Sequence, residues 1–169
     1  MILKKLNKNI IINFLIVFLI FLVDRFSKIY VIYLDKKLSG TELLSTDFLN
    51  IKLYWNQGIA FGLFSFEKSL LYNFITVIIF IIVLVIAFMS IKSIGIRKYA
   101  LLMIFGGAIG NLYDRIIFKA VPDFIDLHVG NFHWFIFNFA DVFISVGVFF
   151  MILFEFVGNN ENKSEDEKY

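Results

Sequence analysis

Two aspartates, Asp123 and Asp141, each lie where a long hydrophobic stretch meets a polar segment. A carboxylate beside hydrocarbon is costly, and such residues tend to be retained for function. If the two carboxyl groups approach within a few ångströms, like-charge repulsion prevents both from ionising at neutral pH. The pair would then share a proton and titrate as a unit, with one member acting as general base and the other as general acid. The sequence does not assign which is which.

Polar residues near these aspartates follow helical spacing. Asn111 and Arg115 are four positions apart and therefore share a helix face, and Asp114 lies about 60° from Asn111 around the helix. An amide, a carboxylate and a guanidinium together indicate either a functional site or an ion-pair lock. Gly106 and Gly110 form a G-x-x-x-G pattern, which is typical of close helix packing.

Two further groups of polar residues have simpler interpretations. Asp24 and Lys28 form an i, i+4 pair in the favourable acid-first order, so we interpret them as a structural ion pair. Asn56 opens a segment, 56–62, whose Asn and Gly residues are typical of a turn.

Histidine and cysteine usage argues against metal and thiol chemistry. His128 and His133 lie near Asp123 and Asp126, but the five-residue spacing fits no common metal-binding pair, and no H-E-x-x-H is present. The absence of cysteine excludes disulfides, a thiolate nucleophile and cysteine-bound metal. No G-x-S-x-G motif indicates a serine hydrolase. We therefore expect no metal and no cofactor.

The composition identifies the environment in which these groups act. The chain has 169 residues, of which 60% are hydrophobic. Soluble domains have about 45–50% apolar residues, so the excess indicates that lipid is the solvent. The net charge of +2 comes from dispersed basic residues, which gives no indication of nucleic-acid binding.

Four apolar stretches are long enough to span a bilayer, which needs roughly 20 residues. They predict helices over residues 10–34, 69–91, 99–117 and 134–154, in one membrane-embedded domain over 1–157. Alternating residues predict a small outer β element within 40–65. The polar tail 158–169 is expected to be disordered. Basic residues cluster before the first helix and between the second and third, which predicts that both termini are cytoplasmic and that the aspartates face outward.

Five motifs, in the same order along the chain, resemble those of lipoprotein signal peptidase, also called signal peptidase II, a family of bacterial intramembrane aspartic proteases. They are Asp24 to Lys28 (D-x-x-x-K), Asn56 to Phe61 (N-x-G-x-A-F), Asn111 to Arg115 (G-N-x-x-D-R), Asp123-Phe124 (V-x-D-F) and Asn138 to Asp141 (N-x-A-D).

The resemblance implies a function, a site and a fold. Asp123 and Asp141 would be the catalytic dyad of an endopeptidase that cleaves diacylglyceryl-modified prolipoproteins just before the lipidated cysteine. Residues that bind substrate or support the site would be Asn56, Asn111, Arg115 and Asn138, and Asp24, Lys28 and Asp114 would form structural ion pairs. The implied fold is an all-α bundle of four transmembrane helices with an extracytoplasmic β-cradle. We expect a monomer, surrounded by lipid, in the bacterial inner membrane.

Three residues depart from the family pattern: Pro122 directly before Asp123, Ile59 in place of a small residue, and Arg25 in place of a neutral one. They affect expectations about loop detail and substrate fit. The alternative function is a small proton-coupled transporter or channel, because intramembrane Asp and Arg also mark ion pathways. That alternative predicts charges through the bilayer depth, whereas the charges here cluster at the outer face.

Overall fold

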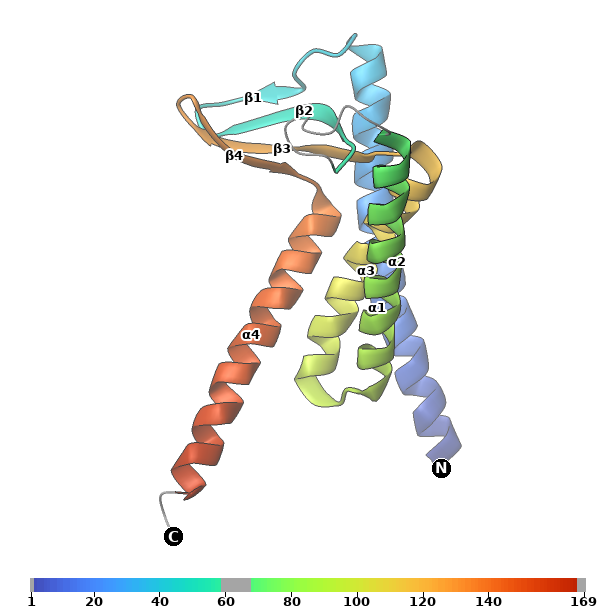
Figure 1. Ribbon diagram of the computed structural model, residues 1–169, viewed down its shortest axis with the longest axis vertical. Coiled ribbons are helices and arrows are strands. Elements are labelled where there is room, and N and C mark those ends of the chain that lie inside the picture. The colour runs from blue at the N-terminus through green and yellow to red at the C-terminus, as the bar shows by residue number, and fades with distance from the viewer. Residues whose placement is uncertain (1, 59–67, 167–169) are drawn as a thin grey trace.

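The described residues of the computed structural model form four long helices and a small sheet, which lies beside the end of the first helix, and both termini lie at the opposite end (Figure 1). The structure describes residues 2–58 and 68–166, with side chains over 9–58 and 70–156. The helices are α1 (Ile2–Lys37), α2 (Lys68–Lys92), α3 (Gly95–Phe118) and α4 (Phe139–Asp166). Each of the four is long and apolar enough to cross a membrane. The predicted fold class, a helical membrane protein with a small sheet, is confirmed.

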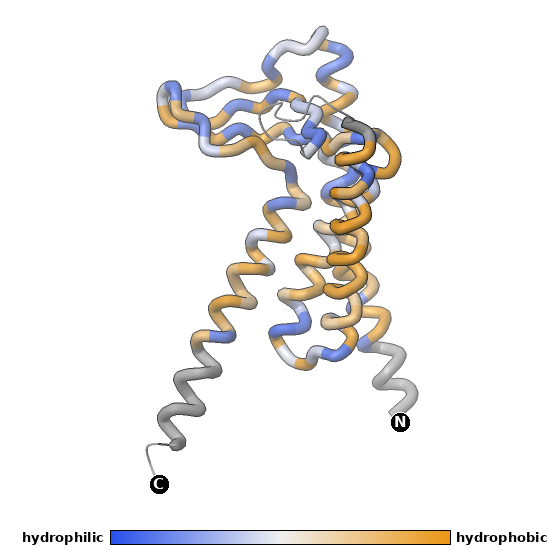
Figure 2. Tube along the Cα trace, viewed as in Figure 1, coloured by the Kyte–Doolittle hydropathy of each residue, from blue (hydrophilic) through white to orange (hydrophobic). Residues whose placement is uncertain are grey.

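The helices form because long, mainly apolar sequence faces a solvent without hydrogen-bonding groups, in which every backbone group must bond within its own helix. α2 contains the most hydrophobic span, with a mean hydropathy of 3.2. Its large side chains point outward; Leu70 and Phe74, for example, are both more than half exposed. Figure 2 shows that hydrophobic residues follow one another along the helices, whereas most hydrophilic residues lie toward the two ends. Such a surface is stable in lipid and not in water.

The sheet has four antiparallel strands in the order β1-β2-β3-β4. They are β1 (Leu44–Ser45), β2 (Leu49–Asn56), β3 (Val121–Val129) and β4 (Phe132–Phe137). β2 pairs with β3 so that Asn56 lies opposite Val121 and Tyr54 opposite Asp123. The pairing therefore brings the end of β2 to the start of β3, although the two segments are far apart in sequence.

The β3–β4 hairpin corrects two predicted boundaries. The sequence predicts a helix over residues 134–154 and no regular element between residues 117 and 134, whereas Val121–Val129 and Phe132–Phe137 are strands and α4 begins at Phe139. The apolar run from Trp134 resembles the start of a span, yet it is the second strand of a hairpin whose turn is at Gly130, with φ +57°. Pairing with β3 decides its structure, because short aromatic runs suit a strand as well as a helix.

Other differences lie at helix ends: α1 begins at Ile2 instead of residue 10, and α4 ends at Asp166 instead of residue 154. β1 and β2 lie inside the predicted outer β segment 40–65, whose residues 59–65 are outside the described part of the chain. The described part of α4 continues to Asp166, and the disorder expected for the tail 158–169 stays a prediction. Extending an existing helix costs far less than nucleating one, so polar residues can continue the long apolar helix.

Close contacts with small residues hold α3 against its neighbours. A Cβ atom on Gly106 would lie 2.9 Å from the Ile20 side chain of α1, and one on Gly107 would lie 2.5 Å from the Ala140 backbone oxygen of α4. Neither position has room for a side chain. Gly106, from the G-x-x-x-G pattern, and Gly107 therefore both serve close helix packing, which brings α1 and α4 against α3 where the polar residues are.

Candidate active site

The two aspartates stand at the junction of helices and sheet. Asp123 lies near the start of β3 and Asp141 in the first turn of α4. Asn138 bonds to both: its side-chain Nδ2 donates to Asp123 Oδ1 at 2.6 Å, and its backbone N–H donates to Asp141 Oδ2 at 3.1 Å. The structure thus brings the predicted catalytic pair to opposite sides of a single asparagine that is fully buried.

Asn138 is also the N-cap residue of α4, directly before its first residue, Phe139. Its Oδ1 accepts the backbone N–H of Asp141 at 3.2 Å, while the Asp141 carboxylate accepts the backbone N–H of Asn138. This reciprocal arrangement is a capping box, which satisfies two N–H groups that a helix start would otherwise leave free. The N-x-x-D spacing is a sequence signal for such a cap. Asp141 is consequently held by the same bonds that define where the helix begins.

Two amides hold Asp123 from opposite sides. Asn56 Nδ2 donates to Asp123 Oδ2 at 2.8 Å, while Asn138 Nδ2 donates to Oδ1. The Asn56 amide is oriented by the backbone N–H of Gly58, which donates to Asn56 Oδ1 at 2.7 Å. Because the amide oxygen is occupied by a donor, the NH₂ group must face the carboxylate.

The same logic orients the amide that holds Asp141. Asn111 Nδ2 donates to Asp141 Oδ1 at 2.8 Å, and Asn111 Oδ1 accepts from Lys28 Nζ at 3.0 Å and from Asn138 Nδ2 at 3.2 Å. A lysine ammonium only donates, so it fixes the Asn111 oxygen on its side and the NH₂ group on the side of Asp141. Three asparagines from β2, α3 and the start of α4 thus direct their NH₂ groups at the two carboxyl groups.

Burial changes the acidity of Asp123, which is only 3% exposed. Loss of water around the carboxyl group raises its pKa to about 6, against the opposing effect of hydrogen bonds from Asn56 and Asn138. The nearby Asp141 carboxylate raises this pKa further, and the Lys28 ammonium lowers it. Asp123 can therefore gain or lose a proton close to neutral pH, as a general acid or base must.

A buried cluster of four charged residues joins α1 to α3 and contacts Asn111 through Lys28. Lys28 Nζ contacts Asp24 Oδ1 at 2.8 Å and Asp114 Oδ2 at 2.7 Å. Arg25 donates to both Asp114 oxygens, with Nη2 at 2.6 Å from Oδ2, and also lies 2.7 Å from Asp24 Oδ2. Asp24 further accepts the backbone N–H of Ala140 at 3.2 Å, which ties the cluster to α4. Two acids and two bases leave the cluster neutral.

Arg25 is the site-supporting residue that sequence reasoning missed. The helical pattern links Asp24 to Lys28, whereas a neighbouring side chain points about 100° away. The length of the arginine side chain compensates for this angle, and its guanidinium also lies 4.9 Å from the ring centre of Tyr113. The departure from the family pattern at this position therefore has a structural role.

Arg115 is not bonded to the dyad within the described residues. Its guanidinium lies beside Gly58, where an added Cβ would be 3.0 Å from Nη1, and its backbone oxygen accepts from Tyr72 Oη at 3.0 Å. Pro122 is buried and lies opposite Trp55 in the β2–β3 register. Ile59 is outside the described part of the chain.

The two histidines face each other across the hairpin, with ring centres 5.2 Å apart. His133 Nδ1 lies 2.9 Å from Oδ2 of Asp126, a buried residue. His128 is five residues along β3 from Asp123, or roughly 16 Å at strand spacing. In the part of the chain that is described, no three His, Cys, Asp or Glu side chains are grouped as a metal would require.

Fold and site together define a multi-pass membrane protein. At one end of its helices, two carboxyl groups accept hydrogen bonds from asparagine side chains. A family model described as signal peptidase (SPase) II matches residues 16–157. A lipoprotein signal peptidase of Pelagibacter ubique (strain HTCC1062) is 48% identical over 163 residues, which cover 96% of this chain and 98% of the relative. One from Aquifex aeolicus (strain VF5) is 40% identical over 136 residues, 79% of each chain.

A solved structure of a bacterial membrane enzyme, obtained by the in meso method at 2.3 Å resolution, superposes with a TM-score of 0.68 and 29% identity over 89% of this chain and 90% of that one. The chain belongs to the signal peptidase II family, as the five motifs predicted. It is therefore a bacterial membrane peptidase, and the transporter or channel alternative has no support.

Proposed function

We propose that this peptidase removes the signal peptide from diacylglyceryl-modified prolipoproteins, cutting just before the lipidated cysteine, with Asp123 and Asp141 as its catalytic dyad. The observation that carries the proposal is the bonding of both carboxyl groups to Asn138 at the junction of the helices and the sheet. The printed name of the relatives, lipoprotein signal peptidase, supports the substrate class.

The chemistry follows from a dyad that holds one proton between its two members. The ionised carboxyl group takes a proton from a water molecule as the water attacks the scissile carbonyl carbon. The protonated one donates to the carbonyl oxygen, and a proton then passes to the departing amine. The raised pKa of Asp123, at about 6, supports such sharing. Which member starts as the acid stays open, because the pair titrates as a unit.

The supporting residues divide into two groups in this proposal. Asn56, Asn111 and Asn138 hold the dyad, since each directs an NH₂ group to one of its carboxyl groups. Arg115 lies beside Gly58 and is assigned to substrate contact. Asp24, Lys28 and Asp114, joined by Arg25, fix the helices next to Asn111 and Asn138.

We further propose that the dyad faces away from the cytoplasm and that both termini are cytoplasmic. Residues 1–8 hold three lysines, and the connection from α2 to α3 brings Lys92, Arg97 and Lys98 to the same end of the bundle. Basic residues favour the cytoplasmic side. The sheet and the start of α4 lie at the opposite end (Figure 1), and they carry Asp123 and Asp141.

Cleavage of a diacylglyceryl prolipoprotein by the purified chain in detergent tests the proposal. Asp123→Asn and Asp141→Asn should each lower the rate by at least about a hundredfold, the usual contribution of a general acid or base. Asp47→Asn is the matched control, because Asp47 is exposed on the same side of the membrane. Cleavage near the parent rate by either dyad variant would refute the assignment, as would loss of activity on adding a chelator.

A further inference from the structure

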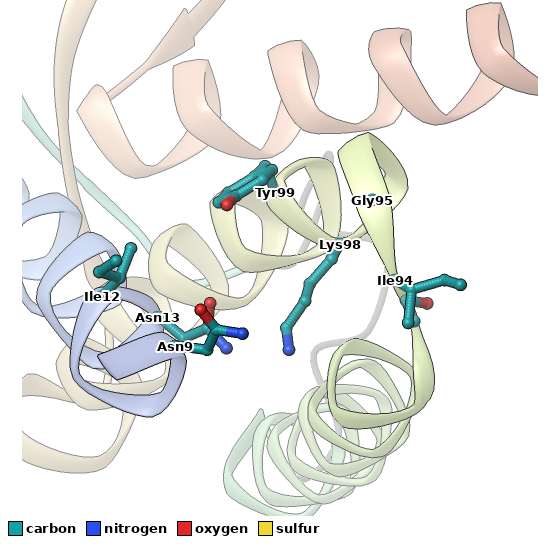
Figure 3. A pocket seen from close by; sticks show the side chains of 8 residues that line it. Asn9, Ile12, Asn13, Ile94, Gly95, Lys98 and Tyr99 are labelled. Atoms are coloured by element: carbon teal, nitrogen blue, oxygen red, sulfur yellow. The ribbon is translucent and has the colours of Figure 1, made fainter. Parts of the chain in front are cut away.

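A polar cavity lies at the end of the bundle opposite the dyad, between α1 and the start of α3 (Figure 3). It has a volume of about 240 Å³, and its lining includes Asn9, Asn13, Ser93 and Lys98. A second cavity of about 430 Å³ is also lined by Asn9, Asn13 and Lys98. A water molecule occupies roughly 30 Å³, so the space suits a much larger group.

The side chains in this cavity favour an anion. The Lys98 side chain extends toward Asn9 and Asn13, as Figure 3 shows. Among the residues whose side chains are described, none of these three makes a side-chain hydrogen bond, and Lys98 has no ion pair, whereas its neighbour Arg97 pairs with Glu155 at 3.4 Å. The Lys98 ammonium and the side-chain amides of Asn9 and Asn13 can therefore all donate hydrogen bonds to one anionic group.

The surroundings of the cavity indicate that this anion belongs to a lipid. Ile91 and Ile94 line the two cavities and are 77% and 87% exposed. In a membrane protein, such side chains lie among acyl chains. Lys98 lies in the first turn of α3, whose apolar span begins at Gly95, and therefore at the level where headgroups meet hydrocarbon. A phosphate bound by Lys98 would have apolar surface directly beside it for its lipid tails.

We propose that Asn9, Asn13 and Lys98 bind the phosphate group of an anionic phospholipid. The first turn of α3 adds to the attraction, because its N-cap residue Ile94 provides no side-chain hydrogen bond and the turn contains no acid. The bound lipid would connect α1 with the α2–α3 connection at the end of the bundle opposite the dyad. This site is independent of the proposed peptidase reaction.

Native mass spectrometry of the full chain, released from detergent with added lipid, tests this site. Phosphatidylglycerol should bind the parent chain at least about tenfold more tightly than phosphatidylcholine, and Lys98→Gln should remove most of that difference, since it deletes a charged hydrogen-bond donor. Lys98→Arg should retain it. Lys92→Gln is the matched control, because Lys92 lies at the same end over the Phe88 ring and lines neither cavity.

Three outcomes would overturn the proposal. Equal losses for Lys98→Gln and Lys92→Gln would indicate diffuse attraction to basic residues instead of a site. Unchanged phosphatidylglycerol binding by Lys98→Gln would exclude Lys98. Displacement of the lipid by an equal concentration of inorganic phosphate would identify a free anion as the ligand. If Lys98→Gln does not fold, Asn13→Leu should weaken phosphatidylglycerol binding in its place, and unchanged binding by that variant would refute the site.

Discussion

Replacing Lys28 with methionine removes one of the two cations that neutralise Asp24 and Asp114. Both carboxylates are fully buried, and so is Lys28. Arg25 would remain within hydrogen-bonding distance of both acids, but one guanidinium cannot balance two buried negative charges. Methionine fills a similar volume, so the change tests charge and hydrogen bonding more than packing.

The expected loss follows from this imbalance. Removing one partner from a buried ion pair costs about 3–5 kcal/mol, because it leaves an uncompensated buried charge. For a chain of this size, each kcal/mol lowers the melting temperature by about 2–4 °C, so Lys28→Met should melt roughly 6–20 °C lower. Adding Asp24→Asn removes the excess charge, and the double variant should regain at least half of the lost stability.

Both effects are measured by thermal unfolding, in one detergent at neutral pH, of four chains. These are the parent, Lys28→Met, Asp24→Asn and the double variant. Lys37→Met serves as the control, since Lys37 is exposed at the end of α1. A Lys28→Met chain that melts within about 2 °C of the parent would refute the role of the cluster. So would a double variant whose loss is simply the sum of the two single losses, because coupling within a network requires non-additivity.

Three further predictions follow from the site. Asp123 has a pKa raised to about 6 in the folded chain, about two units above its ordinary value. The free energy of unfolding should therefore fall by about 3 kcal/mol as pH rises from 4 to 7. Melting curves of Asp123→Asn measured over the same pH range should lack this fall. Asn56→Ala removes a hydrogen bond that lowers this pKa, so the corresponding limb of the pH–activity profile should move to higher pH. Gly107→Ala places a Cβ 2.5 Å from the Ala140 backbone oxygen and should lower both melting temperature and cleavage rate, unlike an alanine at exposed Ser45.

Hydropathy predicts the helices well because lipid imposes a simple requirement on length and polarity. It fails at Trp134, where an apolar run belongs to a strand, because the sequence alone does not reveal the partner strand that accepts its backbone hydrogen bonds. The turn at Gly130 and the Asn138–Asp141 capping box are the local signals that separate β4 from α4.

The sequence names candidate members of the site, but it does not reveal the hydrogen bonds that connect them. Helical spacing placed Asp24 with Lys28, and the structure contains that pair. The bond from Lys28 to Asn111 and the contacts of Arg25 depend on how closely α1 approaches α3, which glycines in α3 determine. The motif resemblance groups Arg115 with the site, and it shares a helix face with Asn111, yet its guanidinium lies beside Gly58, since a long side chain can reach well beyond its own helix face.

The β3–β4 hairpin separates the two aspartates in sequence while its base keeps them together in space. Asp123 lies near the beginning of the hairpin and Asp141 just after its end, whereas Gly130 and Asn131 form the exposed turn at the other end of the strands. Exposed turns of this kind accept insertions well. Insertion of residues or of an epitope at this turn should therefore leave the positions of Asp123 and Asp141, at the base of the hairpin, unchanged.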